Sequence, residues 1–173
     1  MNRVDLTQSH DVLGAYQRGN FEEVISTFGD PGTAYALSVL SGEQQAGYLI
    51  KLAAFRQIQD LKRSLEGDHS FPFNYDLNKV SNILNFAAIC PDVDTGEPTK
   101  LMPWQVFILS QLIGWRNQDG GKRFSRAIVS VARGQGKTYM MSIIACYSYL
   151  VESLGLSNQD FLVASINYKQ TGK

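Results

Sequence analysis

The residues best suited to chemistry lie in one short loop, which has the sequence ARGQGKT over residues 132–138. Gly134 and Gly136 lack side chains, so the backbone can curl with several N–H groups pointing inward at one anion. Lys137 adds a mobile positive charge, and Thr138 adds a hydroxyl of the kind that coordinates Mg²⁺ beside a phosphate. This combination is typical of a loop that binds a nucleoside triphosphate, and it predicts a site for ATP and Mg²⁺.

The segments around this loop predict the elements that position it. Residues 126–132 form a short β-branched run, which predicts a buried strand. Residues 139–154 predict a mostly apolar helix, whose N-terminus adds partial positive charge at the loop. Residues 161–166, FLVASI, predict a second buried strand. Strand, loop, helix and strand make one βαβ unit, so we expect an α/β fold with a parallel sheet.

The match to the full phosphate-loop pattern, G-x-x-x-x-G-K-[ST], is partial because Val131 stands where the first glycine is expected. The alternative is an ordinary turn between a strand and a helix that contains a lysine by chance. The predicted strand before the loop and the predicted helix after it favour the phosphate loop, called Walker A.

The first hundred residues are predicted to be mainly helical. Glycines and prolines interrupt residues 1–42, so we expect short helices and loops there. Residues 43–66 have apolar side chains at three- and four-residue steps and predict an amphipathic helix that ends at Gly67. Its basic edge is either a solvated face or a contact surface for DNA or a partner, and consists of Lys51, Arg56, Lys62 and Arg63.

Two more helices are predicted before the loop. Asp76 or Asn78 can cap a helix that Pro91 stops, after an extended segment. Pro103 suits the first turn of a helix that runs to Trp115. We therefore divide the chain into a helical region, residues 1–100, and the start of an ATPase domain, residues 101–173.

Composition excludes several classes of protein. The chain has 173 residues, of which 44% are hydrophobic, and this is enough for a buried core. Its two cysteines, Cys90 and Cys146, fit neither a disulfide framework nor a zinc module and favour a reducing, cytoplasmic setting. No apolar run approaches the roughly 18 residues that a membrane span requires. The first hundred residues carry 8 basic and 13 acidic side chains, and the remainder carry 8 and 3. The positive second part is suited to attracting ATP or DNA.

Several motifs in combination resemble tailed-phage terminase large subunits. The loop ARGQGKT, with Arg133 early in it, is similar to the deviant phosphate loop of that family. Upstream, Pro103, Trp104 and Gln105 match a Pro-aromatic-Gln segment, and FNYDLNKVSNILNF resembles the helix that precedes it. The resemblance covers roughly residues 75–173 and leaves residues 1–70 without a counterpart.

This resemblance implies a fold, an activity and a set of site residues. The fold is a P-loop NTPase sheet of the RecA-like kind, and the activity is that of an ATP-driven motor that packages viral DNA into procapsids. Gln105 is implied to contact adenine, as a side-chain amide can. Lys137 and Arg133 are implied to be catalytic, although Arg133 could instead pair with an acidic residue or remain solvated. The implied nucleotide contacts are Gln105, Arg133, Gly134, Gln135, Gly136, Lys137 and Thr138, with Thr138 on Mg²⁺.

The resemblance also implies partners and further parts. The partners are double-stranded viral DNA, the small terminase subunit, the portal protein and, in a motor ring, other copies of the chain, with no membrane. An acidic Mg²⁺-binding strand (Walker B) and a nuclease domain are expected but do not occur before Lys173. We therefore expect the chain to be the front part of a longer ATPase and endonuclease. Two alternatives remain open: a helicase-like or other P-loop ATPase, and a non-catalytic fragment that docks on the small subunit or portal.

Overall fold

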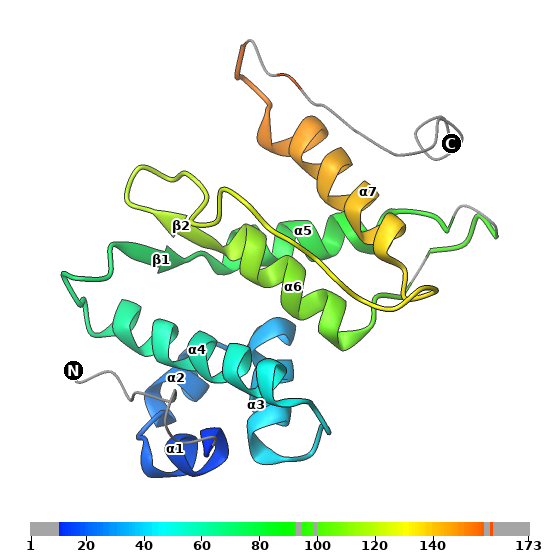
Figure 1. The fold of residues 1–173 in the computed structure, drawn as a ribbon. Coiled ribbons are helices and arrows are strands. Elements are labelled where there is room, and N and C mark those ends of the chain that lie inside the picture. The colour runs from blue at the N-terminus through cyan, green and yellow to red at the C-terminus, as the bar shows by residue number, and fades with distance from the viewer. Residues whose placement is uncertain (1–10, 93–94, 99, 158–159, 161–173) are drawn as a thin grey trace. The chain divides into compact units, whose positions relative to one another are not determined.

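A computed structural model describes residues 11–92, 95–98, 100–157 and 160 of the chain. The chain divides into two compact units, Met1–Ile128 and Val129–Lys173. The first unit holds most of the helices and a small sheet. The second holds the glycine loop and the helix that follows it (Figure 1). The two units are described separately below.

The first unit begins with three short helices, as the glycine-interrupted sequence predicts. They are α1 (Val12–Arg18), α2 (Glu22–Thr27) and α3 (Pro31–Ser41). Asp30 caps α3 because its carboxylate accepts hydrogen bonds from the N–H groups of Gly32 and Thr33, at 3.0 and 3.1 Å. Gly42 ends the same helix with a φ of +84°, which glycine adopts without strain.

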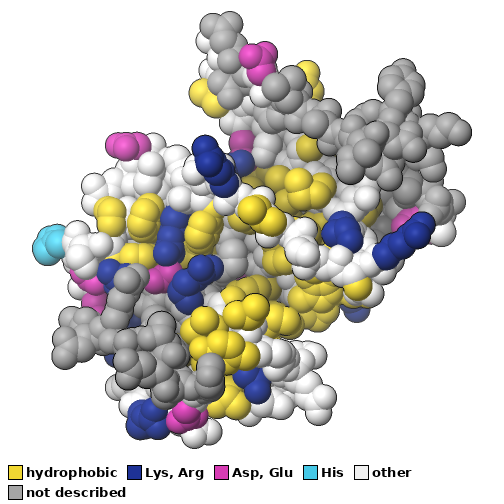
Figure 2. All heavy atoms as spheres, in the orientation of Figure 1, with side chains coloured by type: hydrophobic (Ala, Val, Ile, Leu, Met, Phe, Trp, Pro, Cys, Tyr) yellow, Lys and Arg dark blue, Asp and Glu magenta, His cyan; other side chains and the backbone are white. Residues whose placement is uncertain are grey.

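The amphipathic pattern after Gly42 is confirmed as α4 (Tyr48–Leu65). Ala54, Phe55, Ile58 and Leu61 are buried, each exposed by 1% or less. Leu49, which the pattern also placed on the apolar stripe, is 75% exposed. Leu49 lies in the first turn of α4, ahead of the buried residues of this helix, which begin at Ala54. Other hydrophobic side chains are also visible at the surface (Figure 2). Gly67 follows the helix with a φ of +64°.

The remaining helices of this unit also follow the sequence. Asp76 caps α5 (Leu77–Ile89), so the cap is Asp76 rather than Asn78. Pro103 is the first residue of α6 (Pro103–Gly114). Helix α3 packs against both α4 and α6, and α6 also packs against α5 (Figure 1).

The sheet differs from the prediction. The extended segment before α5 contains β1 (Phe73–Tyr75), which pairs antiparallel with β2 (Trp115–Asn117) directly after α6. Trp115 lies opposite Tyr75, is 0% exposed and contacts Phe71 and Tyr75, with ring centroids 5.6 and 5.1 Å away. Tyr75 and Trp115 thus join the two strands to the buried core of the first unit. Among the described residues this two-stranded antiparallel sheet is the only one.

The expectation of a parallel sheet is therefore not met in the part of the chain that the structure describes. Residues 126–132, predicted as a buried strand, are not assigned to a strand, and Ile128 is 97% exposed. The prediction for residues 126–132 is wrong because a strand exists only where a neighbour accepts its hydrogen bonds, and no described segment pairs with this one. The partner predicted for it, residues 161–166, lies outside the described residues.

The second unit contains the predicted helix, starting two residues earlier. Helix α7 (Lys137–Tyr147) begins in the glycine loop, and a π-helical turn, η1 (Ser148–Glu152), continues it. Met140, Ile143 and Tyr147 are buried and share one face at helical spacing. Gly155 has a φ of +80° just after this run, so the glycine follows the helix as predicted.

Candidate functional site

The backbone of the loop has the geometry that the two glycines permit. Gly134 has a φ of +81° and Gly136 a φ of +69°, both in the left-handed region that other residues rarely adopt. Gly136 is also the N-cap of α7. Left-handed residues next to a helix start allow the backbone to turn N–H groups toward one anion, as in an anion-binding nest.

Helix α7 supplies the positive end of its dipole to this loop. Lys137 and Thr138 are the first two residues of the helix, where N–H groups have no acceptor within the helix itself. The helix has 11 residues and no acidic side chain in its first turn, so nothing within that turn neutralises the partial positive charge. The local structure therefore suits a bound phosphate group.

The side chain of Lys137 folds back along the loop. Its Nζ donates to the carbonyl oxygen of Val131 at 2.6 Å and to that of Ala132 at 3.2 Å. These bonds hold the ammonium group against the backbone that leads into the loop. A phosphate that binds the loop competes with two carbonyls for this ammonium group.

The other predicted loop residues are open to solvent. Arg133, Gln135 and Thr138 are all exposed. Arg133 makes no ion pair with a described residue, so of its three interpretations the switch pairing with an acidic residue is not formed in this part of the structure. Four of the predicted contacts, Gly134, Gly136, Lys137 and Thr138, meet in one short stretch of backbone, and Arg133 and Gln135 lie within the same stretch.

Gln105 lies in α6, which belongs to the first unit, and it has a structural role that the sequence did not predict. Its Oε1 accepts a hydrogen bond from the N–H of Met102 at 2.8 Å, so the side chain closes the start of α6. The residue is only 6% exposed. A glutamine three residues after the N-cap, behind a proline, is the signal that could have revealed this role.

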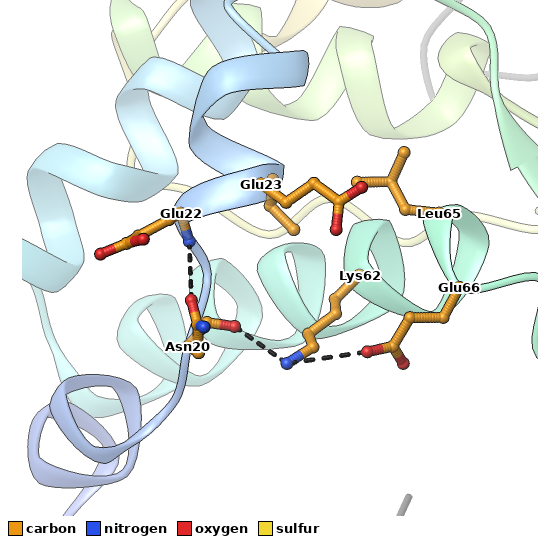
Figure 3. Close-up of a pocket in the computed structure, with 7 residues that line it drawn as sticks. Asn20, Glu22, Glu23, Lys62, Leu65 and Glu66 are labelled. Carbon is orange, nitrogen blue, oxygen red and sulfur yellow. Dashed lines mark hydrogen bonds and ion pairs between the residues drawn. The ribbon is translucent and has the colours of Figure 1, made fainter.

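Two pockets lie in the first unit. One of about 370 Å³ opens near the start of α6 and is lined among others by Tyr35, Pro103 and Val106, although not by Gln105. The other, of about 290 Å³, lies between α2 and α4 (Figure 3). In it, Lys62 Nζ donates to the carbonyl oxygen of Asn20 at 2.9 Å and pairs with Glu66 at 3.7 Å.

The contacts of Lys62 help to decide between the two interpretations of the basic edge of α4. Lys62 is held by Asn20 and Glu66, and Arg63 Nε pairs with Asp68 at 2.8 Å. The guanidinium carbon of Arg56 lies 5.8 Å from the ring centroid of Phe124. Three of the four basic side chains thus make contacts within the unit, which favours the interpretation of this face as a packing surface. An ion pair between Asp60 and Arg123, at 2.8 Å, was not predicted from the sequence because the two residues are far apart in the chain.

No group of three or more His, Cys, Asp or Glu side chains that could hold a metal ion occurs among the described residues. Thr138 is therefore the one predicted Mg²⁺ contact whose position the structure gives. No described helix is long and apolar enough to cross a bilayer.

A left-handed glycine loop that runs into a helix carrying lysine and threonine at its start is typical of phosphate-binding sites. Comparison with known families agrees with this class. Residues 103–173 match the family described as "Terminase large subunit, ATPase domain". The match includes both α6 and the glycine loop and covers less than half of the chain. No curated protein and no solved structure matches the chain.

Proposed function

We propose that residues 132–138 are the phosphate-binding loop of a terminase large subunit and bind ATP with Mg²⁺. The observation that carries this proposal is the pair of left-handed glycines at the start of α7, within a segment of the terminase ATPase family. The backbone N–H groups and Lys137 hold the phosphates, and Thr138 offers its hydroxyl to the metal ion. Mg²⁺, when bound, screens the charge of the phosphates.

Lys137 has a defined part in this binding. Its ammonium group leaves the carbonyl oxygens of Val131 and Ala132 and moves to the β- and γ-phosphates, whose charge attracts it more strongly. Arg133, exposed in the same loop, is a second donor for phosphate oxygens because its planar guanidinium can bind two of them at once. Both residues then stabilise the negative charge of the transferred phosphoryl group.

The wider proposal concerns the intact protein. We infer that it is an ATPase motor that packages double-stranded viral DNA, and that it acts with a small terminase subunit and a portal protein in the host cytoplasm. The family of residues 103–173 supports this inference. A further nuclease domain and a ring of several copies belong to the same proposal.

The test is nucleotide binding by the 173-residue chain. A fluorescent ATP analogue is titrated with and without Mg²⁺ against the wild type, Lys137→Ala and the control Lys51→Ala, whose lysine lies in α4. We expect Mg²⁺-dependent binding by the wild type and the control, and a loss of at least about tenfold in affinity for Lys137→Ala because charged hydrogen bonds to phosphate disappear. Equal affinity of Lys137→Ala and wild type would refute the assignment of the loop.

A further inference from the structure

Arg123 is enclosed by aromatic rings at the turn after β2. Its guanidinium carbon lies 4.7 Å from the ring centroid of Phe71, 4.9 Å from Phe73, 5.0 Å from Trp115 and 5.1 Å from Phe124. The side chain is 15% exposed. Cation–π contacts of this kind are strongest where water is excluded, as it largely is here.

The charge inside this aromatic cage is neutralised by α4. Arg123 Nη1 lies 2.8 Å from Asp60 Oδ2, and the Asp60 side chain is only 7% exposed. Arg63 stands on the other side of the same carboxylate, with Nη1 3.9 Å from Oδ1, and covers the ring of Phe71 at 4.4 Å. The buried carboxylate fixes the position of Arg123, because the enclosed guanidinium would lose this ion pair without it. Arg63 has a second acidic partner in Asp68, at 2.8 Å.

The backbone and a neighbouring side chain secure the same point. The N–H of Arg123 donates to the carbonyl oxygen of Trp115 at 3.1 Å. The indole of Trp115 in turn donates to Oε1 of Gln57, one turn before Asp60 on α4, at 2.8 Å. Helix α4 therefore holds the chain at residues 115–123 through two independent contacts.

The residue after Arg123 is held as well, because Phe124 packs against the core and its ring centroid lies 5.8 Å from the guanidinium carbon of Arg56 on α4. Only seven residues separate Arg123 from Val131, whose carbonyl oxygen binds Lys137. No helix or strand is assigned to residues 124–132, all of which the structure describes. The start of this connection is thus fixed at Arg123, and its end is the phosphate loop.

We propose that Asp60 and Arg123 form a positioning pair that fixes the segment leading into the phosphate loop, so that α4 influences how tightly the loop binds nucleotide. The expected effect on nucleotide affinity rests on the proposed function. The anchor, by which we mean the fixing of this segment by Asp60 and Arg123, rests on the described contacts alone. It gives the N-terminal helices, which lie outside the segment of the terminase family, a part in ATP binding. By linkage, nucleotide in the loop should also strengthen the anchor.

The anchor is tested with a spin label that does not depend on nucleotide. Ser125 is exposed and two residues from Arg123, so Ser125→Cys carries a nitroxide after Cys90→Ser and Cys146→Ser remove the native thiols. We expect Arg123→Met and Asp60→Asn to shorten the rotational correlation time of the label at least about twofold, because a segment released from its anchor moves on the nanosecond scale. Lys122→Met is the control, since it removes the same charge from an exposed neighbour.

The effect on nucleotide affinity is measured on the same variants without the spin label. We expect the dissociation constant of the ATP analogue to rise at least about threefold in Arg123→Met and Asp60→Asn, because a smaller fraction of the loop is competent to bind. Arg123→Lys, which keeps the charge facing Asp60, should restore part of both effects. If circular dichroism shows that Arg123→Met does not fold, Arg123→Lys and Asp60→Asn still test the proposal.

The outcomes separate the two proposals. An unchanged label mobility in a folded Arg123 or Asp60 variant overturns the anchor. Increased mobility with unchanged nucleotide affinity overturns the influence of α4 on the loop. A wild-type chain that binds no nucleotide refutes the proposed function, while the mobility of the label still decides the anchor.

Discussion

Gly134 offers a test of the loop in which steric clash plays no part. Its φ is +81°, and no atom lies within 4 Å of the position that a Cβ would occupy. Gly134→Ala therefore adds backbone strain and nothing else. A left-handed conformation costs an alanine about 1–2 kcal/mol, so the loop should leave this conformation in most molecules.

This cost converts directly into affinity. A free-energy difference of about 1–2 kcal/mol lowers the competent fraction of the loop about 5- to 30-fold, and the apparent dissociation constant rises by the same factor. We expect this increase in a titration with the fluorescent ATP analogue and Mg²⁺. Gly134→Asn should show a smaller increase because asparagine tolerates the left-handed region better than alanine.

Gly67→Ala is the matched control. Gly67 has a φ of +64° and equally open space around its Cβ position, but it lies at the end of α4. We expect it to lower the stability of the first unit while nucleotide affinity stays within about twofold of wild type. A Gly134→Ala chain that is folded and binds as tightly as wild type would show that the left-handed loop is not the binding conformation.

Two further predictions concern the first unit. Asp30 caps α3 and also accepts a hydrogen bond at 3.1 Å from the phenol of Tyr75, whose pKa is raised by burial and by that carboxylate. Asp30→Ala should cost about 1–3 kcal/mol in urea unfolding, the sum of a lost cap and a lost hydrogen bond of the buried phenol, and a loss below about 0.5 kcal/mol would contradict this. Hydrogen bonds from Ser70 and an ion pair with Arg63 lower the pKa of Asp68, so its contribution to stability is present above pH 4 and is lost as the pH falls through that lowered pKa. Acid unfolding followed by circular dichroism should therefore show a weaker pH dependence below pH 4 in Asp68→Asn than in wild type.

The features that could be predicted from the sequence are those set by local patterns. Helix α4 follows from apolar spacing, α5 from its aspartate cap and α6 from Pro103 at its first turn, because each signal lies within a few residues of its effect. The left-handed backbone of the glycine loop could also be predicted, since φ values above zero are chiefly a property of glycine itself.

The features that were missed depend on contacts between distant residues. The antiparallel pairing of Tyr75 with Trp115 joins segments that are forty residues apart in the chain, and neither segment has a strong strand pattern. The pairing of Asp60 with Arg123 spans an even longer separation, so Arg123 could be read only as one of several basic turn residues. The strand predicted for residues 126–132 failed for the converse reason, because its apolar pattern was present but no described neighbour pairs with it.

Gln105 shows how a structural role and a proposed binding role can be separated experimentally. A side-chain carbonyl oxygen has two lone pairs, so Oε1 can accept from Met102 N–H and still accept from the exocyclic amine of adenine. In the proposed adenine contact, the amide N–H₂ group donates to a ring nitrogen of the base. Gln105→Glu therefore keeps the acceptor that closes α6 and removes the donor that the proposed adenine contact needs.

The two roles predict different results for two substitutions. Gln105→Glu keeps the bond to Met102 N–H and should lower the preference for ATP over other nucleoside triphosphates about tenfold, the scale of one lost hydrogen bond to a base. Gln105→Ala should lose that preference and also about 1 kcal/mol of stability, because the start of α6 loses its partner. If Gln105→Glu keeps the full preference for ATP, the glutamine serves α6 alone, and the adenine contact proposed from the terminase resemblance must be assigned to another residue.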